Sequence, residues 1–151
     1  MPQDMEMQRS ICVALLVFAL PAAAQTVTDG DTIKFGTTIY RLWGIDPPET
    51  HQLCDDGWPA GQEATKAMRG LVEGRTVVCE PRGQDRYKRT IALCRADGVD
   101  LGAAMVRAGM AWAFVRYSRD YVDQEHDAQA ERRGVHDHVC VLPWEWRARQ
   151  R

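Results

Sequence analysis

Four acidic residues lie close together along the chain around the first predicted hairpin: Asp29, Asp31, Asp46 and Glu49. Ca²⁺ prefers several hard oxygen ligands, such as carboxylates and backbone carbonyls. Asp31 and Asp46 stand at the ends of strands joined by one hairpin, so their carboxylates can meet if those strands are neighbours. Asp29-Gly30 is also an ordinary turn dipeptide, and both interpretations can hold together.

Glu49 follows two prolines at the end of an apolar run. Pro47 and Pro48 stiffen the backbone at this point. A stiff loop that holds one carboxylate suits a general base, which must lie within hydrogen-bond reach of the water it activates. A solvated loop glutamate is the commoner case for a residue of this kind.

Two arginines stand in contexts that suit an anionic ligand. Arg41 interrupts the apolar run 39–43, and a buried arginine is costly unless it meets an anion. Arg89 ends the segment 85–89, which mixes cationic residues with Tyr87 and therefore suits phosphate binding with base stacking. The alternatives are an arginine on a strand surface and a solvated basic loop.

The pattern of elements predicts an α+β fold. Hydrophobic alternation and turn residues indicate five short strands, at residues 25–28, 32–35, 39–45, 76–79 and 90–94. Helical spacing and capping residues indicate about three helices, at residues 61–73, 101–108 and from Ser118 or Asp120 to residue 133. Five strands with one helix between the third and the fourth is the order of a five-stranded OB-fold β-barrel.

The N-terminal segment has the composition of an export signal. An unbroken apolar run at residues 11–20 is followed by three alanines at 22–24. The run is too short for a transmembrane helix, which needs about 20 apolar residues. We therefore expect a signal peptide over residues 1–24 and a mature domain over 25–151. The mature protein would be secreted or periplasmic, without a membrane anchor.

Cysteine usage fits an oxidising compartment. Beyond the signal segment the chain has four cysteines, which allow three connectivities. We expect Cys79–Cys94, because each ends one of two consecutive strands, and Cys54–Cys140 as the remaining pair. A zinc fragment around His136, His138 and Cys140 is a weaker alternative, because it lacks a clear fourth ligand.

Net charge limits how the chain could meet nucleic acid. The formal net charge is −2, which is not the basic balance of a sequence-independent nucleic-acid binder. Any contact with nucleic acid must therefore be local, through a few placed arginines and lysines.

The order of these residues resembles the thermonuclease, or staphylococcal nuclease, family. Three blocks carry the resemblance: Asp29-Gly30-Asp31-Thr32, Arg41-Leu42-Trp43-Gly44-Ile45-Asp46-Pro47-Pro48-Glu49-Thr50 and Asp85-Arg86-Tyr87-Lys88-Arg89. A later block at 106–111 is similar as well, and the resemblance runs from about residue 27 to 133, with a Trp-containing tail at 134–151. It implies a nuclease that cleaves single-stranded DNA and RNA as a monomer.

The resemblance also assigns roles to individual residues. It implies Ca²⁺ as the cofactor, bound by the carboxylates of Asp31 and Asp46 and by the backbone carbonyl of Pro47. It implies that Glu49 activates the attacking water. Arg41 and Arg89 are expected to hold the scissile phosphate, and Tyr87 and Tyr117 are expected to pack on the nucleotide.

Three positions depart from the family pattern. Lys88 stands where the family usually has glycine, so a positive φ there would strain the loop that aims Arg89. Pro47 replaces a residue that is often threonine or alanine, a change that keeps the carbonyl ligand. Val115 lies near the expected place of a second nucleotide-facing tyrosine.

Two other classes of function remain open at this stage. A non-catalytic nucleic-acid-binding OB-fold module would use the same barrel but would not need Glu49 beside the phosphate. A secreted, disulfide-bonded interaction module would use these charges only to stabilise its fold. Ca²⁺-dependent cleavage would separate both from a nuclease.

Overall fold

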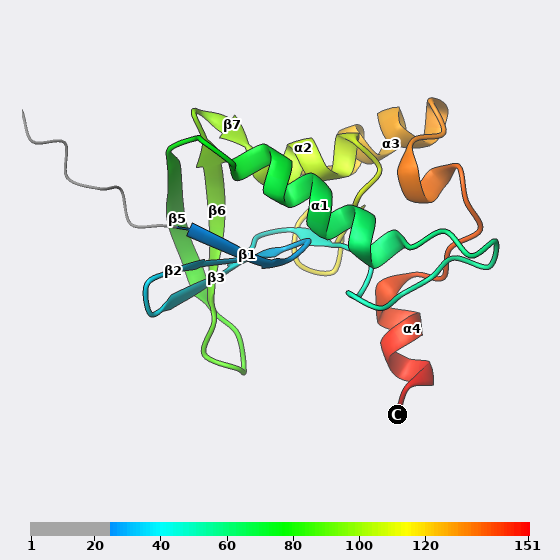
Figure 1. Ribbon diagram of the computed structural model, residues 1–151, viewed down its shortest axis with the longest axis horizontal. Coiled ribbons are helices and arrows are strands. Elements are labelled where there is room, and N and C mark those ends of the chain that lie inside the picture. Colours follow the sequence, from blue (N-terminus) through cyan, green and yellow to red (C-terminus); the bar gives the residue numbers. More distant parts are fainter. Residues whose placement is uncertain (1–24) are drawn as a thin grey trace, which may run out of the picture.

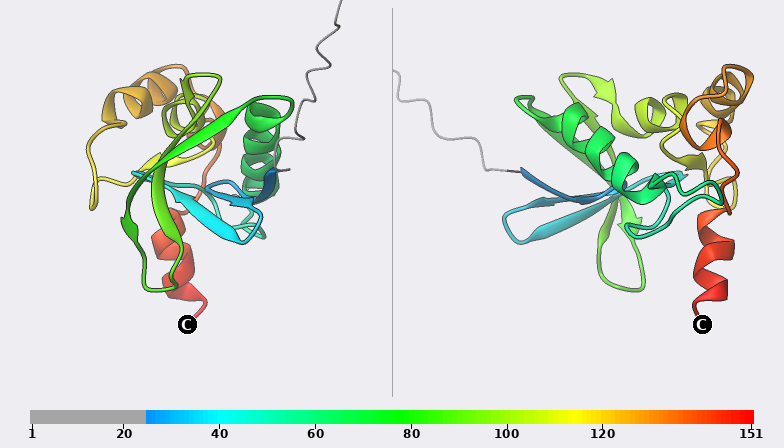
Figure 2. Two further views of the ribbon diagram at one scale, coloured as in Figure 1. Left: turned by 90° about the vertical axis from the view of Figure 1, so that its left-hand side faces the viewer. Right: turned by 45° about the vertical axis from the view of Figure 1, so that its right-hand side comes forward.

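The computed structural model describes residues 25–151, so the predicted signal segment 1–24 lies outside the described residues. The elements follow in the order β1 (Gln25–Asp29), β2 (Thr32–Phe35), β3 (Thr38–Leu42), β4 (Ile45–Asp46), α1 (Ala60–Val72), β5 (Val77–Gln84), β6 (Thr90–Ala96), β7 (Val99–Asp100), α2 (Leu101–Arg107), β8 (Trp112–Ala113), α3 (Val122–Ala130), the short 3-10 helix η1 (Gly134–His136) and α4 (Pro143–Arg149). Helices α1, α2 and α3 gather on one side of the molecule, and α4 extends separately to the C-terminus (Figure 1; Figure 2).

The strands form a mixed sheet in the order β1-β2-β3-β6-β5, with β7 paired to β6. Neighbouring strands are antiparallel except β3 and β6, which run parallel. A separate short ladder joins β4 to β8. The predicted α+β, OB-type fold is confirmed, although within residues 25–151 no recorded pairing closes β5 onto β1.

Helix α1 covers the sheet with one apolar face. Ala64, Met68 and Val72 recur at intervals of four residues, so they lie on one side of the helix, and all three are buried. They pack with Ile33 of β2 and Leu42 of β3 in the main core. Burying a side chain the size of Val72 or Met68 stabilises the fold by about 1.5–3 kcal/mol. These contacts therefore fix the helix against the hairpin that carries the acidic residues.

The structure corrects three predicted elements. The strand predicted at 39–45 is divided into β3 and β4, which pair with different strands, because the chain turns at Gly44 with a φ of 72°. β5 continues to Gln84 rather than ending at residue 79, because an edge strand with a register shift between Pro81 and Gly83 tolerates proline. The third helix, α3, spans only Val122–Ala130, and neither Ser118 nor Asp120 caps it. The Ser118 hydroxyl instead accepts a hydrogen bond from the Asp120 N–H at 3.0 Å, within the loop before the helix.

The tail contains an element that the sequence analysis did not predict, because it assigned no helix to residues 134–151. Pro143 begins α4, where its missing N–H costs nothing, and its side chain is buried. The ring of Trp144 lies 5.6 Å from that of Phe114. Residues 25–151 therefore contain four α-helices rather than about three. In the described part of the chain no helix is long and apolar enough to span a membrane.

Two disulfides join the expected cysteine pairs. Cys79 and Cys94 stand directly opposite each other in the antiparallel β5–β6 ladder and are bonded. Cys54 is bonded to Cys140, so the tail is attached to the loop between β4 and α1. In the chain-entropy model, closing a loop of 15 residues stabilises the fold by about 3 kcal/mol, and the longer loop gains more.

Candidate active site

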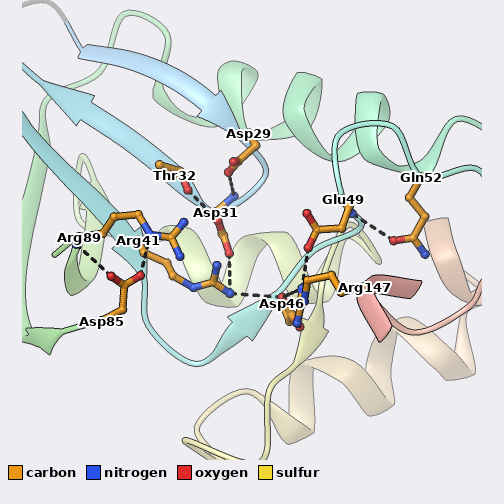
Figure 3. Close-up of polar contacts among 10 residues, drawn as sticks. All are labelled: Asp29, Asp31, Thr32, Arg41, Asp46, Glu49, Gln52, Asp85, Arg89 and Arg147. Carbon is orange, nitrogen blue, oxygen red and sulfur yellow. Dashed lines mark hydrogen bonds and ion pairs between the residues drawn. The ribbon is translucent and has the colours of Figure 1, made fainter. Parts of the chain in front are cut away.

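The carboxylates of Asp31 and Asp46 meet at one arginine (Figure 3). The Nη2 atom of Arg41 lies 3.0 Å from Oδ2 of Asp31 and 3.3 Å from Oδ1 of Asp46. Asp31 leads into β2, Arg41 belongs to β3 and Asp46 ends β4, and the register places Thr32 opposite Arg41. The hairpin between β2 and β3 thus brings two carboxylates from separate strand ends together.

The carboxylates of Asp31 and Asp46 are both buried, and burial shifts the pKa values of Asp31 and of its partner Arg41. Burial raises the pKa of Asp31 to about 7; Arg41 opposes the rise, and nearby Asp29 adds to it. Burial lowers the pKa of Arg41, but the charges of Asp31 and Asp46 raise it, so that it ends above its usual value. The charge of Arg41 alone therefore does not offset the cost of burying the ionised Asp31 carboxylate, and further positive charge beside it would favour the ionised form.

The loop that carries Glu49 is held by its own backbone and by the start of α1. The Glu49 N–H donates to Oε1 of Gln52 at 3.1 Å, and the Gln52 N–H donates to the Glu49 carbonyl at 2.7 Å. A Cβ added at Gly61 would lie 1.8 Å from that carbonyl oxygen. Only glycine at position 61 lets the loop approach the helix this closely.

Arg89 is positioned by Asp85 within the loop between β5 and β6. Its Nε donates to Oδ2 of Asp85 at 2.6 Å, and its backbone N–H donates to Oδ1 of the same residue at 3.0 Å. Burial raises the pKa of Asp85, but the hydrogen bonds from Arg89 outweigh it, so the pKa ends below its usual value. Within residues 25–151 the two terminal nitrogens of Arg89 make no recorded hydrogen bond or ion pair, so they remain available to an anion.

One cavity brings together six of the eight residues predicted for catalysis, metal binding and nucleotide binding. It is lined by Asp29, Asp31, Arg41, Asp46, Pro47, Pro48, Glu49, Thr50 and Arg89. Tyr87 and Tyr117 do not line it, and both are largely exposed. Tyr87 lies under two guanidinium groups, those of Arg86 and Arg89, at 4.8 and 5.6 Å from the ring centre.

The sequence analysis missed Arg147, which reaches the site from α4 (Figure 3). Its Nη2 lies 2.7 Å from Oδ2 of Asp46, and its Nη1 lies 2.6 Å from Oε1 of Glu49. These hydrogen bonds, chiefly those to Asp46, raise its pKa further above the usual range. No local signal marks Arg147 among the five arginines between residues 132 and 151, since its role depends on where the tail docks.

The residues at the cavity fit a hard divalent cation. The donors are two buried carboxylates and the carbonyl of Pro47, all of them oxygens, which is the ligand type of Ca²⁺ and Mg²⁺. No group of three or more His, Cys, Asp or Glu side chains in the described part of the chain could hold a metal alone. Water or a substrate oxygen would have to complete the coordination.

Comparison with known proteins identifies the family. The family model described as staphylococcal nuclease homologue matches residues 39–137, more than half of the chain. The chain therefore belongs to the staphylococcal nuclease family, as its sequence blocks predicted, and is a nuclease hydrolase.

Individual relatives agree with this assignment. An uncharacterized endonuclease of Haemophilus influenzae is 34% identical over 133 residues, covering 83% of this chain and 71% of its own length. One from Escherichia coli is 33% identical over 159 residues, covering 95% of this chain and 100% of its own length. A probable staphylococcal-like nuclease of Oryza sativa is 32% identical over 114 residues, covering 74% of this chain and 33% of its own length.

Lys88 adopts the positive φ that the sequence analysis anticipated, with φ 64°. A residue with a side chain is destabilised by roughly 1–2 kcal/mol in this left-handed region, and glycine avoids that cost. Part of the gain is lost again, because glycine makes the unfolded chain more flexible. We predict that Lys88→Gly raises the free energy of unfolding by up to about 1 kcal/mol and leaves activity equal or higher. Urea denaturation and a nuclease assay measure both.

Arg132→Gly is the matched control, because exposed Arg132 has φ 51° but does not line the cavity. It should gain stability without a change in activity. A large fall in activity in Lys88→Gly alone would mean that the Lys88 ammonium contacts the substrate.

Proposed function

We propose that the protein is a Ca²⁺-dependent nuclease that hydrolyses phosphodiester bonds of single-stranded DNA and RNA. The observation that carries the proposal is the convergence of Asp31, Asp46, Glu49, Arg41 and Arg89 around one cavity. A module that only binds nucleic acid has no need of three carboxylates beside the phosphate, since they repel it. All of these residues belong to one chain, so the proposed chemistry needs no residue from a second copy.

Each side chain has a task in this proposal. Glu49, within a loop fixed by Gln52 and Gly61, accepts a proton from water as the water oxygen bonds to phosphorus. The ester P–O bond breaks, and the leaving oxygen takes up a proton from solvent water. Asp31, Asp46 and the Pro47 carbonyl would hold the cation. Bound Ca²⁺ supplies positive charge that offsets the charge of the phosphate.

The two arginines hold the phosphate from different elements, Arg41 from strand β3 and Arg89 from the loop between β5 and β6. Arg41 uses Nη2 for the carboxylates, and Arg89 uses Nε for Asp85, so each retains N–H groups that suit phosphate oxygens. These donors are fixed before substrate arrives, which favours stabilisation of charge that develops in the transition state. Exposed Tyr87, beside Arg89, offers a face for base stacking, and Tyr117 offers a second.

The test of function is Glu49→Gln, which keeps the shape but removes the base. We expect kcat on single-stranded DNA with Ca²⁺ to fall by about 10²–10⁴-fold. The exposed Glu73→Gln is the control and should keep full activity. Full turnover in Glu49→Gln would contradict the role of Glu49, and cleavage that persists in excess chelator would contradict the role of the metal.

Arg41→Ala and Arg89→Ala test the phosphate contacts. Each variant should lower kcat more than it raises KM, because preorganised donors act mainly on the transition state. The activation free energy of the chemical step should rise by about 2.7–4 kcal/mol. Arg82→Ala, on the exposed edge strand β5, should change neither constant. A change in KM alone would make the two arginines simple phosphate anchors.

We propose in addition that the protein acts outside the cytoplasm. Two disulfides support this, because such bonds persist in secreted and periplasmic proteins. The apolar run before the alanines at 22–24 supports it independently. N-terminal sequencing of exported protein should read from Gln25, and a protein that retains residues 1–24 would contradict the cleavage.

A further inference from the structure

The C-terminal segment is attached at several points to the loop that carries Glu49. Cys140 is bonded to Cys54, and the Asp55 N–H donates to the Val139 carbonyl at 2.8 Å. The side chain of Gln52 makes a further link, because its Nε2 donates to the Val141 carbonyl at 2.6 Å. The loop and the tail therefore form one unit from which α4 begins.

Arg147 is the point at which this unit meets the site. Its Nη1 and Nη2 lie 3.1 and 2.7 Å from the two carboxylate oxygens of Asp46, and Nη1 also lies 2.6 Å from Oε1 of Glu49. One planar guanidinium thus bridges a carboxylate placed to hold the cation and the carboxylate placed to act as base. A lysine ammonium, as a point charge, could not reproduce this fork.

The arrangement leaves the reacting positions open. Arg147 does not line the cavity, whereas Asp46 and Glu49 do. Within the described residues, Oε2 of Glu49 accepts no recorded hydrogen bond, so it is free to receive a proton from water. Gln52 fixes the backbone of Glu49 at the same time as Arg147 fixes its side chain.

We propose that Arg147 is a positioning residue of the nuclease, and that α4 serves to deliver it to the site. The bridge holds the Glu49 carboxylate at a set place relative to Asp46 through Oε1, and Oε2 keeps no recorded partner within the described residues. This rests on the function proposed above. Residues that orient active-site ligands through hydrogen bonds typically contribute about 10–100-fold to activity or metal affinity.

The experiment compares Arg147→Gln, Arg147→Lys and the control Arg149→Gln, which changes an exposed arginine of the same helix. Steady-state cleavage of single-stranded DNA with Ca²⁺ gives kcat and KM. Fluorescence anisotropy in chelator gives the Kd for the same DNA without turnover. Thermal unfolding reports whether each variant folds.

We expect kcat of Arg147→Gln to fall about 10–100-fold, while KM and the Kd in chelator stay within about threefold. Arg147→Lys should lie between Arg147→Gln and the wild type, and Arg149→Gln should match the wild type. A further variant, Arg147→Ala, leaves space for a small cation in place of the side chain. Added methylguanidinium should restore part of its kcat, a rescue that loss of helix packing alone would not show.

Three results would overturn the positioning role. Unchanged or increased kcat in Arg147→Gln would show that the bridge is dispensable or that it blocks the site. A Kd that weakens as much as kcat falls would make Arg147 a direct phosphate contact. An equal fall in Arg149→Gln would assign the effect to α4 as a whole. An inactive wild type would instead contradict the proposed function itself.

Discussion

The contact of two buried carboxylates with one arginine is the constraint on which the site depends. Asp31 and Asp46 lose their hydration, and Arg41 compensates only part of the resulting cost. The arrangement persists because the backbone fixes it: the β2–β3 ladder sets Thr32 opposite Arg41, and β4 is held by β8. A sheet that tolerated a one-residue slip would turn one of these side chains to the opposite face.

The other two functional side chains are held on loops, each by a local device. Glu49 depends on Gly61, where the absence of a side chain allows close approach of the loop to α1. Arg89 depends on Asp85, whose carboxylate accepts from three N–H groups of the segment 85–89. The strands therefore set the distance between the carboxylates, and the loops set the direction of the base and of the second arginine.

Much of this could be predicted from sequence because the signals were local. Turn dipeptides, alternation and the three family blocks located β2, α1 and the residues around the cavity, and the strand ends suggested Cys79–Cys94. Other features depended on context. The strand predicted at 76–79 continues through Pro81, which a strand tolerates because β5 lies at the edge of the sheet. The Ser118 hydroxyl accepts a hydrogen bond from the Asp120 N–H and does not cap α3.

Helix α4 in the tail could not be predicted from local sequence, because its formation depends on contacts with distant parts of the chain. α4 has seven residues, and an isolated helix of fewer than about 12–15 residues is marginal in water, so it forms only through its tertiary contacts. The disulfide Cys54–Cys140 lowers the entropy cost of forming those contacts, because it already joins the tail to the loop in the unfolded chain. It closes a loop of 86 residues, against 15 for Cys79–Cys94, and by loop length alone it stabilises the fold by about 1.5 kcal/mol more. The helix, its arginine and the loop of Glu49 are thus ordered together, and removing the bond should loosen the site before it loosens the sheet.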